Sequence, residues 1–252
     1  MRLSIQYYLI PLFCIAFFMN QGFSQNPAAI DFNIKESDSE AIAIADEVME
    51  AMGGRMNWDK TRYLSWKFFS FRKLIWDRYT GDVRIHDLKS DTKILMNVNT
   101  GKGKVSRKGE ILSDTSAECL KALERGKKIL VNDAYWLIMP MKLKDSGVTL
   151  KYLGKGNALD GSSADILQLT FNQVGYTPDN KYWVYVDSQT RLVSQWSFFK
   201  SAKDEKPEFS NPWTDYKKHG NVLLSSGRGR AEGGMEEIVV HKKIDQKIFT
   251  QF

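Results

Sequence analysis

The side chains best able to do acid–base or metal chemistry in this sequence are three histidines, His86, His219 and His241. Zinc enzymes commonly place two histidines one helical turn apart, as in H-E-x-x-H, so that both rings point from one helix face. No two histidines here have that spacing. Alternation along "VRIHDL" and "VVHKK" places His86 and His241 on the solvent-facing sides of strands. The sequence therefore predicts no metal site and no cofactor.

Nucleophilic and phosphate-binding motifs are equally sparse. The segment "GSS" at 161–163 precedes a strand pattern, whereas a nucleophile elbow joins a strand to a helix. The segment "GKGKVS" from Gly101 lacks the third glycine of a dinucleotide-binding loop and opens a strand rather than a helix. Asp82 and Asp87 are candidates for a carboxylate pair on the first hairpin, but the favoured interpretation is that both are structural surface acids. No motif predicts a catalytic residue.

The first 24 residues are typical of a signal peptide. Arg2 supplies a short basic region, residues 9–19 form an apolar stretch, and Gly22 and Ser24 are small residues suited to cleavage before Gln25. The apolar stretch is shorter than the ~20 residues that span a bilayer. We therefore expect a periplasmic or secreted protein, with residues 25–252 forming a single β domain.

The charge of the chain is a weak guide to a partner. There are 36 Lys and Arg against 30 Asp and Glu, a formal net charge of +6, without a long block of one sign. We expect no nucleic-acid partner, whereas short basic runs such as "RGKK" leave transient contact with an anionic membrane surface open. Cys119 is the single cysteine after the leader, so stability without an internal disulfide is expected.

The spacing of apolar residues predicts two helices among many strands. Residues 36–54 carry an apolar stripe at helical spacing, with Ser37 or Asp38 as a cap and glycines at the end. Residues 114–133 form a second helix, with Thr115 and Glu118 at capping-box spacing and Cys119, Leu123 and Leu130 on its inner side. Period-two patterns predict strands over 62–76, with a bulge or turn around residues 70–73, and over 82–88, 93–98, 103–107, 135–139, 148–153, 164–171, 182–186, 191–199, 213–218, 221–226 and 237–244.

The strands around "KYWVYVDSQTRLVSQW" are apolar on both faces, unlike those of a half-solvated sheet. Trp183 and Tyr185 share one face, and Tyr182 and Val184 the other. Such strands occur in the middle of a sandwich or beneath helices, or in a curved sheet around an apolar cavity. A membrane-spanning barrel fits less well, because its strands are about ten residues long. The strand pattern predicts a mainly β, α+β fold built on an antiparallel sheet or barrel, and a strongly curved antiparallel sheet is one of the arrangements that it leaves open.

Three segments resemble successive strands of the LolA/LolB-like superfamily of periplasmic lipoprotein carriers: "YWLIMPMKLKDSGV", "YWVYVDSQTRLVSQW" and "WTDYKKHGNVLL". The specific cue is a strand ending in Asp187, a short turn, a strand restarting at Leu192, and then an aromatic-Asp-Tyr segment before Gly220-Asn221. The resemblance implies an incomplete barrel around an apolar cavity, with the two predicted helices in lid positions. It covers most of the chain after the leader, but no lipid-contacting residue of the family can be matched to a position here.

The resemblance and the aromatic strands together suggest an exported binding or carrier protein for a lipid, a lipidated ligand or another apolar ligand, without chemistry. Two alternatives stay open: an exported hydrolase using scattered acids with His86 or His219, and an envelope scaffold whose apolar strands form a filled core. Alternation predicts an inward set that lines a pocket or fills the core: Leu64, Trp66, Phe68, Leu167, Leu169, Phe171, Trp183, Tyr185, Trp196 and Phe198.

Overall fold

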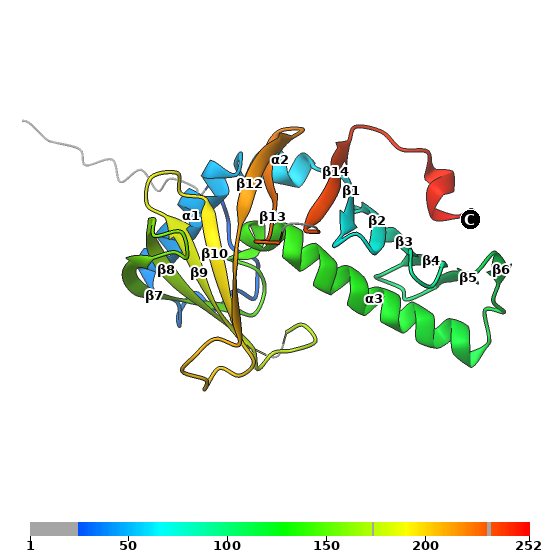
Figure 1. Cartoon of the computed structure of the whole chain (residues 1–252), viewed down its shortest axis with the longest axis horizontal. Helices are drawn as coiled ribbons and strands as arrows, with labels where there is room; N and C mark the ends of the chain where they lie inside the picture. Colours follow the sequence, from blue (N-terminus) through cyan, green and yellow to red (C-terminus); the bar gives the residue numbers. More distant parts are fainter. Residues whose placement is uncertain (1–24, 173, 231–232) are drawn as a thin grey trace, which may run out of the picture.

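The computed structural model describes residues 25–172, 174–230 and 233–252, and the predicted signal peptide lies outside them. Helix α1 runs over Ser39–Ala51, α2 over Arg55–Lys60 and α3 over Ala117–Ile138. Short 3₁₀ helices follow at Met139–Lys142 (η1) and Gln246–Phe249 (η2). The rest of the regular structure is antiparallel sheet (Figure 1).

A seven-stranded sheet has the order β14-β1-β2-β3-β4-β5-β6, so all its neighbours except β14 are consecutive in the chain. Consecutive pairing follows from the short turns that the sequence places between these strands. Phe69 and Ser70 make the β1–β2 turn with positive φ angles of 44° and 62°. The strands are β1 Tyr63–Phe68, β2 Arg72–Asp77, β3 Asp82–Asp87, β4 Thr92–Asn97, β5 Gly103–Arg107, β6 Glu110–Ile111 and β14 Met235–His241.

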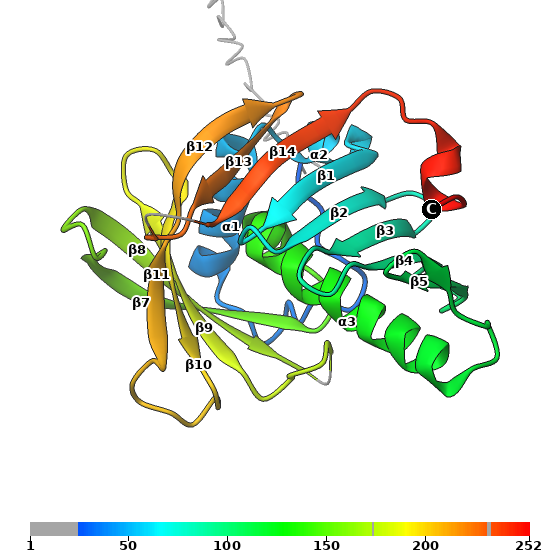
Figure 2. The same ribbon diagram turned by 45° about the vertical axis from the view of Figure 1, so that its right-hand side comes forward.

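A five-stranded sheet in the order β11-β10-β9-β8-β7 forms the other half of the molecule. A two-stranded sheet, β12-β13, lies between the two larger sheets and continues their curvature (Figure 2). The sheets do not close into a barrel, which confirms the predicted curved, incomplete antiparallel architecture. The strands are β7 Val148–Asn157, β8 Ser163–Phe171, β9 Lys181–Asp187, β10 Val193–Phe199, β11 Phe209–Pro212, β12 Thr214–His219 and β13 Val222–Gly227.

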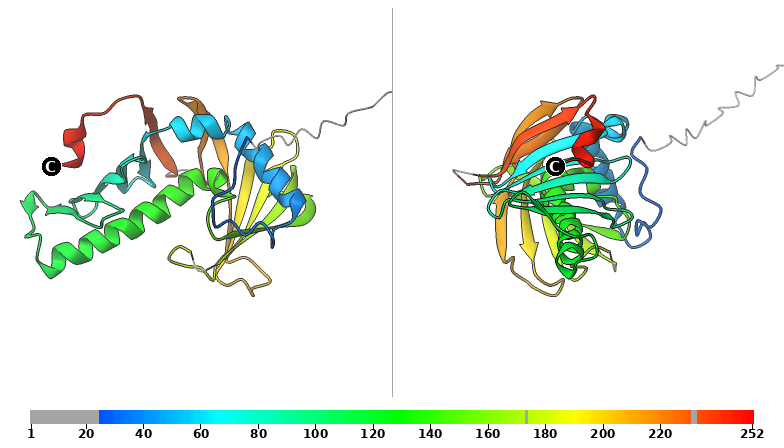
Figure 3. Two further views of the ribbon diagram at one scale, coloured as in Figure 1. Left: turned by 180° about the vertical axis from the view of Figure 1, so that it is seen from behind. Right: turned by 90° about the vertical axis from the view of Figure 1, so that its right-hand side faces the viewer.

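Helix α3 crosses the inner side of this curved assembly, and α1 lies against the five-stranded sheet (Figure 3). The hydrophobic core joins both helices to both large sheets. Val48 of α1, Leu137 of α3 and Leu74 of β2 are all fully buried in it. The core therefore depends on α3 bringing the two halves of the β structure together.

One predicted strand is wrong. Residues 135–139 belong to the last turn of α3 and the start of η1, not to a strand. Tyr135, Trp136 and Leu137 suit either state by propensity, and packing against both sheets favours the helix. The start of α3 also differs from the expectation by one residue, because Ser116 is the N-cap and accepts a hydrogen bond from the Cys119 amide at 3.1 Å.

Candidate functional site

Helix α3 lies close to the seven-stranded sheet at Gly126. A Cβ atom built at this glycine would lie 3.0 Å from Met96 Sδ and 3.2 Å from Ile94 Cγ2. The missing side chain therefore allows the helix backbone to approach β4. Leu123 and Leu130, on the same side of α3, are buried, as the sequence predicted.

An ion pair joins the C-terminal half of α3 to β2. The guanidinium of Arg72 donates to both carboxylate oxygens of Asp133, at 2.7 Å each. The side chain of Asp133 is fully buried, and burial raises its pKa although Arg72 and Asn132 act in the opposite direction. Arg72 also lies over the rings of Phe68 and Phe71, at 4.9 and 4.4 Å from the ring centroids.

A groove of about 320 Å³ opens between the N-terminal half of α3 and strands β3, β4 and β5. We call it the α3 groove. Its inner wall is apolar, formed by Ile85 and Ile94 from the sheet and Ala122 and Ile129 from the helix. This volume falls in the usual range for small-ligand pockets, roughly 300–1,000 Å³. The groove is therefore large enough for part of an apolar ligand.

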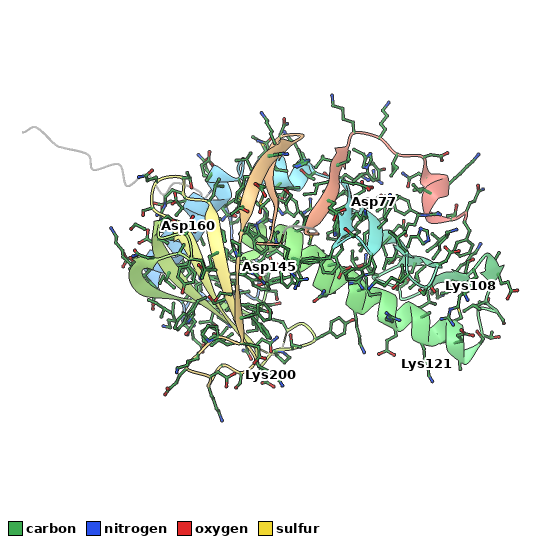
Figure 4. The ribbon with its side chains drawn as sticks, in the orientation of Figure 1. Asp77, Lys108, Lys121, Asp145, Asp160 and Lys200 are labelled. Carbon is green, nitrogen blue, oxygen red and sulfur yellow. The ribbon has the colours of Figure 1, made fainter. Side chains whose placement is uncertain are left out.

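Charged side chains form the rim of the α3 groove. Arg107 pairs with Glu118, and Arg125 lies 4.0 Å from Asp87. Burial raises the pKa of Asp87, but hydrogen bonds from Ser90 outweigh that effect and hold it below the usual value. Lys121, which is labelled on α3 in Figure 4, is the one charged rim residue without an ion pair in the described part of the chain. The rim thus offers a free ammonium group beside an apolar wall.

Aromatic rings pack together beneath the C-terminal half of α3. The ring of Trp196 stacks on Tyr182 with centroids 5.0 Å apart and meets Trp136 edge-on at 4.7 Å. The rings of Phe198 and Phe209 lie 5.1 Å apart, and Phe209 remains 38% exposed. These distances are those of direct ring contact, so this part of the interior is filled by side chains.

Arg228, the residue that follows strand β13, holds the C-terminal end of α3 in place. Its guanidinium donates to the carbonyl of Trp136 in the last turn of the helix and to Ser225 Oγ at 2.8 Å. A cation at this end of a helix is favoured by the helix dipole. The same group lies 3.6 Å from the ring centroid of Trp213, and burial lowers its pKa.

The strand register decides where the predicted inward set lies. Val184 is opposite Leu167 on one side and Trp196 on the other, so these three side chains share the face that packs on the helices. Trp183 and Tyr185 lie on the reverse face, contrary to the expected inward placement. The reverse face is also covered by side chains, since Phe199 is fully buried beside Trp183. Both faces of the strand are therefore apolar, and alternation could not show which of them faces the helices.

The other eight residues lie on the helix-facing side. On β1, Leu64, Trp66 and Phe68 are buried, as are Leu167, Leu169 and Trp196 in the second sheet. Phe171 and Phe198 are half-buried near the C-terminal ends of β8 and β10. None of the ten lines the α3 groove, and none lines the pocket beside Lys60 or the one beside Lys144. Their predicted contact with a ligand stays a prediction, and the α3 groove was found only from the structure.

Of the candidate carboxylate pair, Asp87 lies at the rim of the α3 groove beside Arg125, whereas Asp82 lies at the other end of β3. The other catalytic candidates lie outside the lining of the groove. Ser65 Oγ lies 2.7 Å from His241 Nε2, and no carboxylate contacts that histidine within the described chain. His86 Nε2 lies 2.8 Å from Asp91, in an exposed turn. Cys119 is buried, and its burial raises the pKa of the thiol. Among the residues placed by the structure, no three His, Cys, Asp or Glu side chains are grouped to hold a metal ion.

A search for membrane-spanning helices gives none within residues 25–172, 174–230 and 233–252.

Comparison with protein-family models gives no match, and comparison with the curated proteins gives none. Among solved structures, a DUF1329 family protein from Desulfovibrio piger is similar over 83% of this chain and 96% of its own, with 13% identity and a TM-score of 0.45. A Vibrio parahaemolyticus domain whose proposed role is outer membrane lipoprotein sorting is similar over the same shares, with 9% identity and a TM-score of 0.41. MucB in complex with MucA(peri) matches 73% of this chain and 61% of its own, at 13% identity and a TM-score of 0.24.

The resemblance expected from the sequence is thus found again among solved structures, in the Vibrio domain. Because these TM-scores lie below 0.5, function is inferred below from the geometry of this chain alone.

Proposed function

We propose that this chain is a binding or carrier protein for a lipid or another ligand with an apolar chain, and that it acts without chemistry. The observation that carries the proposal is the α3 groove, whose wall of Ile85, Ile94, Ala122 and Ile129 is apolar. Each methylene transferred from water to such a wall contributes about 0.8 kcal/mol. Lys121 at the rim would attract an anionic head group while the apolar chain is buried.

The filled aromatic interior supports a specific division of roles. The buried residues of the predicted inward set hold the sheets and α3 in place, and the ligand occupies the space left open at the other half of the helix. Arg72 and Asp133 lie between these two regions and fix the helix against β2. The groove therefore has a rigid floor and one wall made by a single helix.

Uptake of a fluorescent fatty acid, cis-parinaric acid, by the delipidated chain tests the proposal. We expect saturable binding of one molecule per chain, and Ala122→Trp should weaken it strongly by filling the groove. Leu120→Trp is the matched control, because Leu120 is in the same helix and 57% exposed, outside the groove lining. Both variants should keep the thermal midpoint of the wild type.

The other outcomes are equally informative. Absence of uptake by the delipidated wild type, or full uptake by Ala122→Trp, would contradict the proposal. A chain that neither takes up nor retains lipid on native mass spectrometry would favour a scaffold with a filled core. Turnover of an ester probe would instead favour the hydrolase alternative, and His86→Ala and His219→Ala would then be the first variants to assay.

Export to the periplasm or beyond is part of the same proposal. It rests on the basic, apolar and small-residue pattern of residues 1–24, with cleavage before Gln25. N-terminal sequencing of the chain from an envelope fraction is expected to begin at Gln25. A mature chain that begins at Met1 would contradict it.

A further inference from the structure

Another pocket lies at the opposite end of the strands from the α3 groove. It has a volume of about 530 Å³, and its lining residues come from α2, the start of β1, the turn before β13 and the segment after β14. Strand register separates the two sites. Tyr63 of this pocket is paired with Asp77, whereas Asp87 and Thr92 of the α3 groove are paired with each other at the other end of the same sheet.

The lining of this pocket, which we call the basic pocket, carries charge of one sign. Four of its residues are lysine or arginine and none is aspartate or glutamate: Lys60, Arg62, Lys242 and Lys243. The other polar side chains of the wall are Asn57, Thr61, Tyr63, Asn221 and His241. Such a concentration of positive charge in a concave site attracts anions more strongly than the same charges on a flat surface.

The acids nearest in the chain are already engaged elsewhere. Arg62 donates to both oxygens of Asp77, whose side chain is fully buried and which also accepts from the Tyr79 amide. Asp59 pairs with Arg55 at 2.8 Å. Asp245 accepts from the Lys247 amide at the start of η2. No ion pair neutralises Lys60, Lys242 or Lys243 among the described residues, so three ammonium groups remain free around one cavity.

We propose that the basic pocket binds a phosphate-bearing anion. The planar fork of Arg62, the group best suited to a single carboxylate, is already occupied by Asp77, which leaves lysines as free donors. Lysines act as point charges and suit the several oxygens and higher charge of a phosphate group. The phosphate belongs either to a soluble compound or to the head group of an anionic lipid. This site goes beyond the proposed function, because it does not depend on what the α3 groove binds.

Two binding measurements on the mature chain distinguish the sources. Calorimetric titration with inorganic pyrophosphate measures binding of soluble phosphate, and co-sedimentation with vesicles of phosphatidylglycerol against phosphatidylcholine measures binding of the head group. Lys242→Gln with Lys243→Gln should weaken binding about tenfold or more, since charges that focus on one site act together. Lys203→Gln with Lys206→Gln is the matched control, because it removes the same charge from the exposed loop between β10 and β11.

Each result assigns or overturns the site. Pyrophosphate binding that only the pocket variant weakens identifies a soluble ligand, and the same dependence with phosphatidylglycerol vesicles alone identifies a lipid head group. Absence of binding to both probes, or equal weakening by the pocket and loop variants, would overturn the proposal. Ala122→Trp should leave either result unchanged, which keeps this test independent of the α3 groove.

Discussion

Arg72 on β2 and Asp133 on α3 form a two-hydrogen-bond ion pair at 2.7 Å, although they are 61 residues apart in the chain. The pair lies between the α3 groove and the packed aromatic rings. Among the described residues it is the ion pair between α3 and β2, and it holds the helix against that strand.

A double-mutant cycle measures this pair. Arg72→Met or Asp133→Leu alone should lower the free energy of unfolding by about 3–5 kcal/mol, because each leaves a buried charge without its partner. The double variant should cost less than the sum of the two single variants, since neither charge then remains. Urea unfolding gives the three values. Simple additivity would show that the two side chains are not coupled.

The loss of stability on replacing Trp66 or Trp183 by alanine tests which face of its strand each side chain occupies. Trp66 is 2% exposed in the core, so Trp66→Ala should lower the free energy of unfolding by about 3–5 kcal/mol. Trp183 is half-buried and packs on Phe199 from the reverse face, so Trp183→Ala should cost clearly less. Chemical denaturation of both variants makes the comparison. An equal or larger cost for Trp183→Ala would contradict the assigned faces.

Gly126 is predicted to be intolerant of a large side chain. Gly126→Leu would force new atoms against Ile94 and Met96, and overpacking of this kind costs about 1–3 kcal/mol. Lys127→Leu is the control, because Lys127 is the exposed neighbour on the same helix. The thermal midpoint should fall for the first variant and stay close to that of the wild type for the second. A more stable Gly126→Leu would mean that α3 does not approach β4 closely.

His219 should make stability depend on pH. Burial lowers its pKa, Lys217 adds to the shift, and a hydrogen bond with the Ile238 backbone opposes it. The unfolded chain then binds the proton more readily than the folded one, so stability is present above the unfolded pKa of about 6.5 and is lost as the pH falls below it. His219→Gln should flatten this part of the curve of unfolding free energy against pH. If the slope of unfolding free energy against pH is the same in His219→Gln as in the wild type, the lowered pKa of His219 is contradicted.

Local patterns in the sequence predicted most of the β structure because strand periodicity and turn residues act over a few neighbouring positions. The meander from β1 to β5, the helix around Leu123 and the antiparallel pairing were all predicted in this way, whereas the incomplete barrel was implied by the family resemblance. The same reasoning failed at residues 135–139, where Tyr135 and Trp136 contact Tyr182 and Trp196 of the second sheet. Helix or strand was decided there by contacts with residues far away in the chain.

The sequence by itself determined the strand periods, the turns, the absence of familiar catalytic motifs and the apolar character of both faces of β9. Only the tertiary structure decided which face of β9 meets the helices, because two apolar faces give the same pattern and differ only in what covers them. The tertiary structure also created both pockets. Lys60 and Lys243 are far apart in sequence, as are Ile85 and Ile129, and each pair is brought to one cavity by strand pairing and by the packing of α3.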